Sequence, residues 1–309
     1  MLKKIALVAA LLVALTLLAV LVPAGNVLPD AYADELPVFE KVELGADIAP
    51  LPTEGRAPYK PNAAGYGEDG LSYRDESINV KIYKTRAYDT PVFIAFVQIA
   101  DASQLRTEQA QRYPSTAVAR TDVMARRCNA VIATNADYYV FHNGGIIYRQ
   151  GELLRNRAHS KYDGLAIDAN GDFHLVCPLS EGCFDSLTSP IVNSFCFGPA
   201  LVVDGEVWDN SDRVVTYKQR MGIGQLDHLC YVMVATDGPE EKNSVGLSIP
   251  QFSQLMKDLG AVQAYNLDGG ASTSMIFLDA KVNGQQPRKF RNVSDIVYFA
   301  TAVPDGGEA

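Results

Sequence analysis

The segment from residue 77 to residue 100 constrains the fold most, because it contains two adjacent strand patterns of different kinds. Its first part, SINVKIYKTR (77–86), alternates apolar and polar residues, which is typical of a strand with one buried face. Its second part, PVFIAFVQIA (91–100), is a nearly continuous apolar run, which is typical of a strand buried on both faces. We therefore expect a sheet whose two faces are both covered at the second strand.

Turn residues predict two further hairpins. The segments GLAID and GDFHLV meet at Asn170-Gly171, and PALVVDGEVW turns at Asp204-Gly205. Asn-Gly and Asp-Gly are the preferred pairs for two-residue hairpin turns.

Two helices are also expected. One covers 115–129, and the other follows Ser248, with Pro250 in its first turn and Gly260 at its end. Several strands and few helices together indicate an α+β domain.

The N-terminus indicates export. Lys3 and Lys4 precede an apolar run over residues 5–22, and Ala31-Tyr32-Ala33 has the small-x-small form that signal peptidase cleaves. The alternative is an uncleaved membrane anchor, since the run just reaches spanning length. Both interpretations place the rest of the chain outside the cytoplasm, either secreted or anchored at the cell surface.

Four parts are expected along the chain. A proline- and glycine-rich stretch after the N-terminal segment is typical of a linker, and the strand patterns begin near Leu71. The predicted parts are a signal peptide or anchor (1–33), a linker (34–70), the folded domain (71–303) and a short tail (304–309).

Composition and charge indicate a globular protein and argue against nucleic-acid binding. The 309 residues are 48% hydrophobic and 20% charged, which is ordinary for a globular chain. The formal net charge of −9 and the lack of any basic block predict no nucleic-acid partner. No motif requires a cofactor, although acidic loops leave a divalent cation, calcium or magnesium, as an open alternative. No pattern indicates an oligomeric state.

The cysteines give one structural expectation. Cys177 and Cys183 bracket the short loop PLSEG and are the best candidates for a disulfide in an exported chain. The odd total of five leaves at least one thiol unpaired, and no Cys-x-x-Cys indicates a redox or zinc site.

Two segments of the chain resemble each other. NAVIATNAD (129–137) and GAVQAYNLD (260–268) share five identical positions, and each follows a predicted helix. The match is either a chance product of an Ala- and Val-rich chain or a structural echo. In the second case, two buried strands end side by side and bring two Asn/Asp pairs to one rim.

The residues after the second segment allow two interpretations. Asp268 is followed by Gly269 and Gly270 and then by three hydroxyl residues. Asp-Gly is a common hairpin turn. Alternatively, the carboxylate is held at a strand end, and the glycines let a ligand approach the backbone closely.

The segment NLDGGASTSM (266–275) resembles the Asn-Leu-Asp-Gly-Gly signature of the phosphodiester glycosidase family. Six other segments resemble parts of the family's pattern in the same order, and the similarity covers about 71–303. They are ATNADYY, GGIIYRQGEL, FGPALVVDGEV, QRMGIGQ, VATDGP and RNVSDIVYF. One departure is Ala136, which stands where the family usually has glycine. The resemblance implies a single domain of mixed, largely antiparallel β-sheet with packed helices.

The resemblance also implies hydrolysis of the glycosidic bond of a sugar-1-phosphodiester. Breaking that bond builds oxocarbenium character on the sugar, while the departing phosphate monoester is already a stable anion. One carboxylate, together with cations and hydrogen-bond donors for the phosphate, would then suffice. The expected catalytic residues are Asp268, Asp237 and Asp137. The expected substrate-binding residues are Asn135, Arg149, Arg220, Asn266, Gly269, Gly270, Ser272 and Thr273.

Plainer roles stay open for some of these side chains. Asp237 could only form a turn, Asp137 could cap the next segment, and Arg220 could be a solvated strand residue.

Two alternative functions also stay open. The first is a non-catalytic glycan-binding or cell-envelope assembly protein on the same fold. The second is a metal-dependent phosphodiesterase that cleaves the P–O bond instead. In each case we expect a glycan or a sugar phosphodiester as the partner. We expect contact with a membrane only through residues 5–22, and only if this segment is not cleaved off.

Overall fold

The computed structural model describes residues 35–53, 57–159, 161–210, 216–284 and 289–304. The predicted signal peptide or anchor lies outside the described residues, as does the tail beyond residue 304. Within them, no helix is both long enough and apolar enough to cross a membrane.

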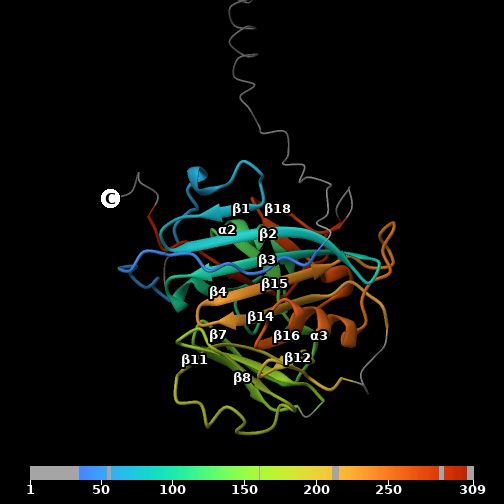
Figure 1. Cartoon of the computed structure of the whole chain (residues 1–309). Coiled ribbons are helices and arrows are strands. Elements are labelled where there is room, and N and C mark those ends of the chain that lie inside the picture. The colour runs from blue at the N-terminus through green and yellow to red at the C-terminus, as the bar shows by residue number, and fades with distance from the viewer. Residues whose placement is uncertain (1–34, 54–56, 160, 211–215, 285–288, 305–309) are drawn as a thin grey trace, which may run out of the picture. The chain divides into compact units, whose positions relative to one another are not determined.

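The largest sheet has eight strands in the order β1-β2-β3-β15-β14-β16-β12-β13, and all of its pairings are antiparallel. Figure 1 shows these strands stacked in that order from β1 to β12. Every residue of β3 is buried, as the apolar run predicted. The strands are β1 (Ser72–Arg74), β2 (Ile78–Ala87), β3 (Thr90–Ile99), β15 (Cys230–Thr236), β14 (Met221–Asp227), β16 (Gln263–Leu267), β12 (Ala200–Val203) and β13 (Glu206–Val207).

A second sheet has five antiparallel strands in the order β18-β17-β6-β20-β4. Its inner strand β6 is buried at every residue. The strands are β18 (Ala280–Lys281), β17 (Met275–Phe277), β6 (Ile132–Asn135), β20 (Asp295–Phe299) and β4 (Leu105–Gln109).

Three smaller antiparallel groups complete the strands: β10-β9-β11, the β7-β8 hairpin and the β5-β19 pair. The predicted hairpins at Asn170-Gly171 and Asp204-Gly205 are confirmed as β9-β10 and β12-β13. The bounds are β9 (Gly164–Asp168), β10 (Phe173–Val176), β11 (Ile191–Phe195), β7 (Gly145–Arg149), β8 (Glu152–Arg157), β5 (Ala119–Arg120) and β19 (Asn292–Val293). Four 3-10 turns occur at Ala63–Gly65, Ala102–Gln104, Tyr139–Phe141 and Gly270–Ser272.

Helix α3 (Ile249–Asp258) begins where the sequence predicted. Ser248 forms a capping box with Gln251, and Pro250 lies in the first turn. The buried face of the helix packs on the eight-stranded sheet, where a Cβ on Gly222 would lie 2.9 Å from the Phe252 ring. Glycine at this position therefore lets the helix approach the sheet closely.

The other expected helix is shorter than predicted, because α2 covers only Thr121–Arg127. Ala119 and Arg120 instead pair with β19 as a short strand. Among the described residues only these two α-helices occur, and every strand pairing is antiparallel. The fold is therefore mostly antiparallel β-sheet, as expected. The expected mixed sheet is not seen in the described residues, and the expected α+β class with packed helices is only weakly supported by these two helices.

Part of the predicted linker packs against the domain. Leu51 is buried, and its backbone N–H donates to the Ser103 hydroxyl at 2.7 Å. The Gln98 side chain exchanges hydrogen bonds with both backbone groups of Val42. The linker boundary at residue 70 stays a prediction.

Candidate active site

The Asp-Gly-Gly segment connects the two large sheets and is not a hairpin turn. Strand β16 pairs with β14 and β12 in the eight-stranded sheet, whereas β17 pairs with β6 and β18 in the five-stranded sheet. The residues between them, 268–274, form a loop that contains a 3-10 turn. The plain hairpin interpretation of Asp268 is therefore wrong.

The ends of the two similar segments lie side by side, although their strands belong to different sheets. The Asn135 amide donates to the Asp268 carbonyl at 2.6 Å, and Asn135 Oδ1 accepts from the Ser274 N–H at 3.0 Å. The Asp268 N–H donates to the Ala136 carbonyl at 3.1 Å. Asn135 thus joins both ends of the 268–274 loop, which gives it a positioning role.

Glycine is required at the two positions of this loop for different structural reasons. A Cβ on Gly269 would lie 2.7 Å from the Gln219 carbonyl oxygen, so no larger residue fits. Gly270 has a positive φ of 59° and donates its N–H to the same carbonyl at 2.9 Å. Both glycines therefore hold the loop tightly against the start of β14.

The Asp268 side chain is the carboxylate that this arrangement leaves partly accessible. Burial raises the pKa of Asp268, and the negative charge of Asp137 raises it further. The Ser272 side chain, the Arg291 charge and the Gly269 backbone act in the opposite direction. A half-buried carboxylate on a rigid loop can stabilise a cation, attack a reacting carbon or accept a proton.

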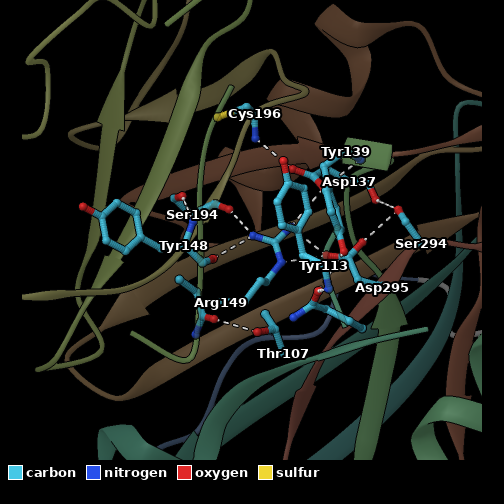
Figure 2. Close-up of polar contacts among 12 residues, drawn as sticks. Thr107, Tyr113, Asp137, Tyr139, Tyr148, Arg149, Ser194, Cys196, Ser294 and Asp295 are labelled. Carbon is cyan, nitrogen blue, oxygen red and sulfur yellow. Dashed lines mark hydrogen bonds and ion pairs between the residues drawn. The ribbon is translucent and has the colours of Figure 1, made fainter. Parts of the chain in front are cut away.

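Asp137 and Arg149 instead belong to a buried ion network with Asp295 (Figure 2). Arg149 Nη2 is 3.0 Å from Asp137 and 2.6 Å from Asp295, and the side chains of all three residues are at most 2% exposed. Asp137 Oδ2 also accepts from the Cys196 N–H at 3.0 Å. Both carboxylate oxygens of Asp137 are thus bonded within the protein, and its expected catalytic role stays a prediction.

Arg149 has no donor available for a phosphate. Its Nε donates to Asp295 at 2.8 Å, and its Nη1 donates to the carbonyls of Tyr148 and Ser194. Its guanidinium also lies over the rings of Tyr139 and Phe195. All of its donors are thus directed to groups of the protein, and the expected phosphate contact of Arg149 stays a prediction.

Asn266 is a second positioning residue. Its amide donates to the Gly198 carbonyl at 2.8 Å, and its backbone N–H donates to the Pro199 carbonyl at 3.0 Å. The neighbouring Tyr265 hydroxyl accepts from the Phe197 N–H at 2.8 Å. These bonds fix the 197–199 loop to the end of β16 and use one of the two N–H donors of the Asn266 amide. Among the described residues, the amide oxygen of Asn266 has no hydrogen-bond partner.

Arg220 is buried without an acidic partner among the residues that the structure describes. The residue is 9% exposed, and it donates to the carbonyls of Leu247 at 2.8 Å and Thr216 at 2.5 Å. Burial lowers the pKa of Arg220 to about 10. The Arg220 Cα would lie 3.8 Å from a Cβ on Gly269, so its backbone adjoins the Asp268 loop. Its Nε and Nη2 are thus held by the backbone at Leu247 and Thr216.

A groove of about 610 Å³ lies beside the loop and is lined by Gly270, Ala271 and Thr273. Asp237 lines it at 2% exposure and accepts from the Gly284 N–H at 2.9 Å. The cationic side chains at the groove are Lys242, Lys281, Lys289 and Arg291, and the other acidic ones are Glu240 and Glu241.

Thr273 and Ser272 of the loop are almost completely buried. Within the described part of the chain, Thr273 Oγ1 and the Gln219 amide oxygen at the groove have no hydrogen-bond partner. The structure therefore brings Asp268, Ser272, Thr273 and the groove together, but separates Asp137 and Arg149 from them.

Sequence reasoning missed two neighbours of Asp268. Arg291 is exposed and acts electrostatically on the Asp268 carboxylate, and Tyr138 responds to the Asp268 charge. Both residues belong to motifs that carried the family resemblance, ATNADYY and RNVSDIVYF. The two motifs could have pointed to Arg291 and Tyr138. However, the sequence alone did not show which side chains of these motifs lie near the Asp268 loop.

Two further expectations concern metals and disulfides. Within the described residues, no group of three or more His, Cys, Asp or Glu side chains is placed to hold a metal ion. Cys177 and Cys183 are both thiols in the structure, which lends the predicted disulfide no support.

Comparisons with known proteins agree with this fold. The sequence model of the phosphodiester glycosidase family matches residues 128–300. The zebrafish N-acetylglucosamine-1-phosphodiester alpha-N-acetylglucosaminidase catalytic domain, auto-inhibited by its pro-peptide, is similar in structure. Its TM-score is 0.60 at 17% identity, over 79% of this chain and 87% of that one.

A hypothetical protein from Synechocystis is also similar, with a TM-score of 0.52 at 15% identity. That match covers 72% of this chain and 62% of the other. At these identities the structural likeness shows the fold alone. A search of curated proteins found no significant match.

Proposed function

Since the chain belongs to the phosphodiester glycosidase family, we propose that it hydrolyses the glycosidic bond of a sugar-1-phosphodiester. The observation that carries the proposal is the position of Asp268. Its half-buried carboxylate projects from a loop clamped by Asn135, beside a groove with cationic side chains. The family match supplies the reaction class, and this geometry supplies the group that would act.

The chemistry of the reaction fits one such carboxylate. Cleavage of the anomeric C–O bond builds positive charge on the sugar, which a nearby carboxylate stabilises. The leaving phosphate monoester needs little proton donation, because it is already an anion. Asp268 would therefore act as the catalytic carboxylate, either toward the sugar cation or by activating water.

The phosphate needs a local positive charge, because the protein carries a net charge of −9. Arg291 fits this role best, since it lines the groove and acts electrostatically on Asp268. Guanidinium groups match phosphate oxygens bidentately. Arg220 is a second candidate as a buried cation, although its Nε and Nη2 already donate to backbone carbonyls.

The proposed setting is outside the cytoplasm. The apolar run at 5–22 and the Ala-Tyr-Ala site at 31–33 support export or anchoring at the cell surface. The substrate would then be a phosphodiester on a cell-surface or host glycan. Intact-mass analysis of the protein purified after expression with its N-terminal segment would show whether cleavage follows Ala33.

Turnover of defined substrates tests the function. The protein starting at residue 34 would be incubated with N-acetylglucosamine-1-phospho-methylmannoside and with other sugar-1-phosphodiesters, and free sugar would be measured. We expect release of sugar by the wild type and by Asp279→Asn, an exposed carboxylate in the β17-β18 turn, but not by Asp268→Asn. Folded wild-type protein that cleaves none of the panel would overturn the proposal. Binding of a glycan without cleavage would instead support the non-catalytic alternative.

A further inference from the structure

A cluster of partly exposed rings lies beside the Asp268 loop and has no part in the hydrolysis proposed above. Its rings are those of Tyr138, Phe141, His142, His159, Tyr162 and Phe197. The Tyr138 ring is central, with its centroid 5.1 Å from Phe197 and 5.4 Å from His142. Tyr162 continues the cluster at 5.3 Å from His142. Three separate loops therefore build one aromatic surface.

This surface is fixed next to the catalytic loop. Burial raises the pKa of Tyr138, and the charges of Tyr162, Asp268 and Asp137 raise it further. Tyr138 therefore lies within electrostatic reach of Asp268. Phe197 is held by the hydrogen bond from its N–H to the Tyr265 hydroxyl, and Tyr265 lies three residues before Asp268 on β16.

Polar groups at the cluster lack partners among the described residues. There, Nε and Nη2 of Arg155 form no hydrogen bond, and the ring of His142 has none beyond a backbone interaction with Gly144. Nη1 of Arg155 donates to the carbonyls of Tyr139 and His142, so its guanidinium belongs to this cluster. Each buried polar group left unpaired is unfavourable, which indicates that water or a ligand completes the cluster.

The chemistry of these groups favours a neutral polar ligand. Burial lowers the pKa of His142, which keeps its imidazole neutral, with one nitrogen as donor and the other as acceptor. Such a pair matches a hydroxyl or an amide. Rings with a few polar groups between them are typical of small-molecule sites. A pyranose has an apolar face of C–H groups and polar substituents at its edge, so it fits this combination.

We propose that the cluster is the subsite for the sugar ring of the substrate, and that the pyranose packs on Tyr138. The inference rests on the proposed function and deepens it by defining how the substrate is oriented in the site. The sugar lies on the aromatic side of Asp268, and the phosphate lies on the groove side at Arg291. Tyr138 is then a specificity-determining residue that acts through its ring and not through its hydroxyl.

Binding and kinetics with Tyr138 variants test this subsite. Saturation-transfer NMR would follow free N-acetylglucosamine, glucose and galactose on the Asp268→Asn protein, with and without Tyr138→Ala. Steady-state rates would compare Tyr138→Ala and Tyr138→Phe in the otherwise wild-type protein. Tyr88→Ala is the matched control, because Tyr88 is an exposed tyrosine in the β2-β3 turn.

We expect Tyr138→Ala to abolish saturation transfer and to lower kcat/KM about ten-fold or more, mostly through KM. Tyr138→Phe should restore binding and most of the lost rate, and Tyr88→Ala should match the wild type. Unchanged binding and rate in Tyr138→Ala would overturn the subsite, as would a Tyr138→Phe variant as impaired as Tyr138→Ala. Tyr138-dependent sugar binding without turnover of any phosphodiester would reject the proposed function but retain the subsite.

Discussion

The side-chain amide of Asn135 holds the backbone carbonyl of Asp268 at 2.6 Å, although the two residues are 133 positions apart. The same side chain accepts from the Ser274 N–H, so one residue of the five-stranded sheet fixes the whole loop that leaves the eight-stranded sheet. A catalytic carboxylate must be placed to within a fraction of an ångström. If Asp268 is the catalytic carboxylate proposed above, Asn135 contributes to catalysis by positioning it.

Asn135→Ala should lower both stability and kcat. Each buried backbone group left unpaired is expected to lower the free energy of unfolding by about 1–3 kcal/mol. Asn283→Ala is the matched control, because Asn283 also bonds two backbone groups, the Met275 N–H and the Thr273 carbonyl. Urea unfolding should show similar losses for both variants, whereas kcat should fall further for Asn135→Ala. Equal kcat in the two variants would contradict the positioning role.

Asp268→Asn should lose activity and gain stability at neutral pH. The raised pKa of Asp268 means that the folded state disfavours its charged form. The wild type therefore loses stability as the pH rises through this raised pKa, and the asparagine variant does not. Thermal unfolding should show a higher Tm for the variant at pH 7.5 and no difference below about pH 3.9, the ordinary pKa of aspartate. A lower Tm at pH 7.5 would mean that the charged carboxylate stabilises the fold.

Arg149 and Arg291 are assigned different roles, the first in the buried ion network and the second in phosphate binding. The same change, arginine to methionine, can be made at each position to compare them. Arg149→Met leaves two buried carboxylates without a cation and should lower the free energy of unfolding by about 3–5 kcal/mol. Arg291→Met removes an exposed side chain and should change stability by no more than about 0.5 kcal/mol. It should instead raise KM about ten-fold or more, since a charge-assisted hydrogen bond to phosphate is lost. Urea unfolding and steady-state kinetics on both variants check this. The assignment fails if Arg149→Met is stable and Arg291→Met binds substrate normally.

The buried network should make stability depend on pH near neutrality. One arginine cannot neutralise two buried carboxylates, and burial raises the pKa of Asp295 to about 7. The folded state therefore holds a proton that the unfolded chain releases near pH 4, so stability falls as the pH rises from 4 to 7. Asp295→Asn should flatten this part of the curve. Urea unfolding between pH 4 and 8 measures this dependence of stability on pH. An unchanged slope in the variant would show that the folded state does not hold the extra proton at Asp295.

Local signals in the sequence predicted the parts of the fold that local chemistry determines. The Asn170-Gly171 and Asp204-Gly205 turns, the helix start at Ser248 and the apolar β3 strand each depend on neighbouring residues. The expected helix at 115–129 is shorter in the structure, because Ala119 and Arg120 pair with a strand far along the chain. Tertiary pairing overrode a weak helical pattern there.

The site was predictable only in part, because charge pairing across the fold is not visible in the sequence. Arg149 and Asp295 are 146 positions apart, and their buried contact with Asp137 could not be read from the sequence. The Asp268 loop was found because its Gly-Gly pattern is local. The aromatic cluster was missed, because its rings come from three loops that only the folded chain brings together.

The position of oxygen-18 after hydrolysis in labelled water tests the central claim most directly. The account predicts that wild-type protein with a sugar-1-phosphodiester places the label in the released sugar, with none in the phosphate monoester, and that Asp268→Asn releases neither product. Label in the phosphate would contradict C–O cleavage at the glycosidic bond and would support a phosphodiesterase instead. Mass spectrometry of the sugar and phosphorus NMR of the phosphate monoester read the two outcomes from one reaction.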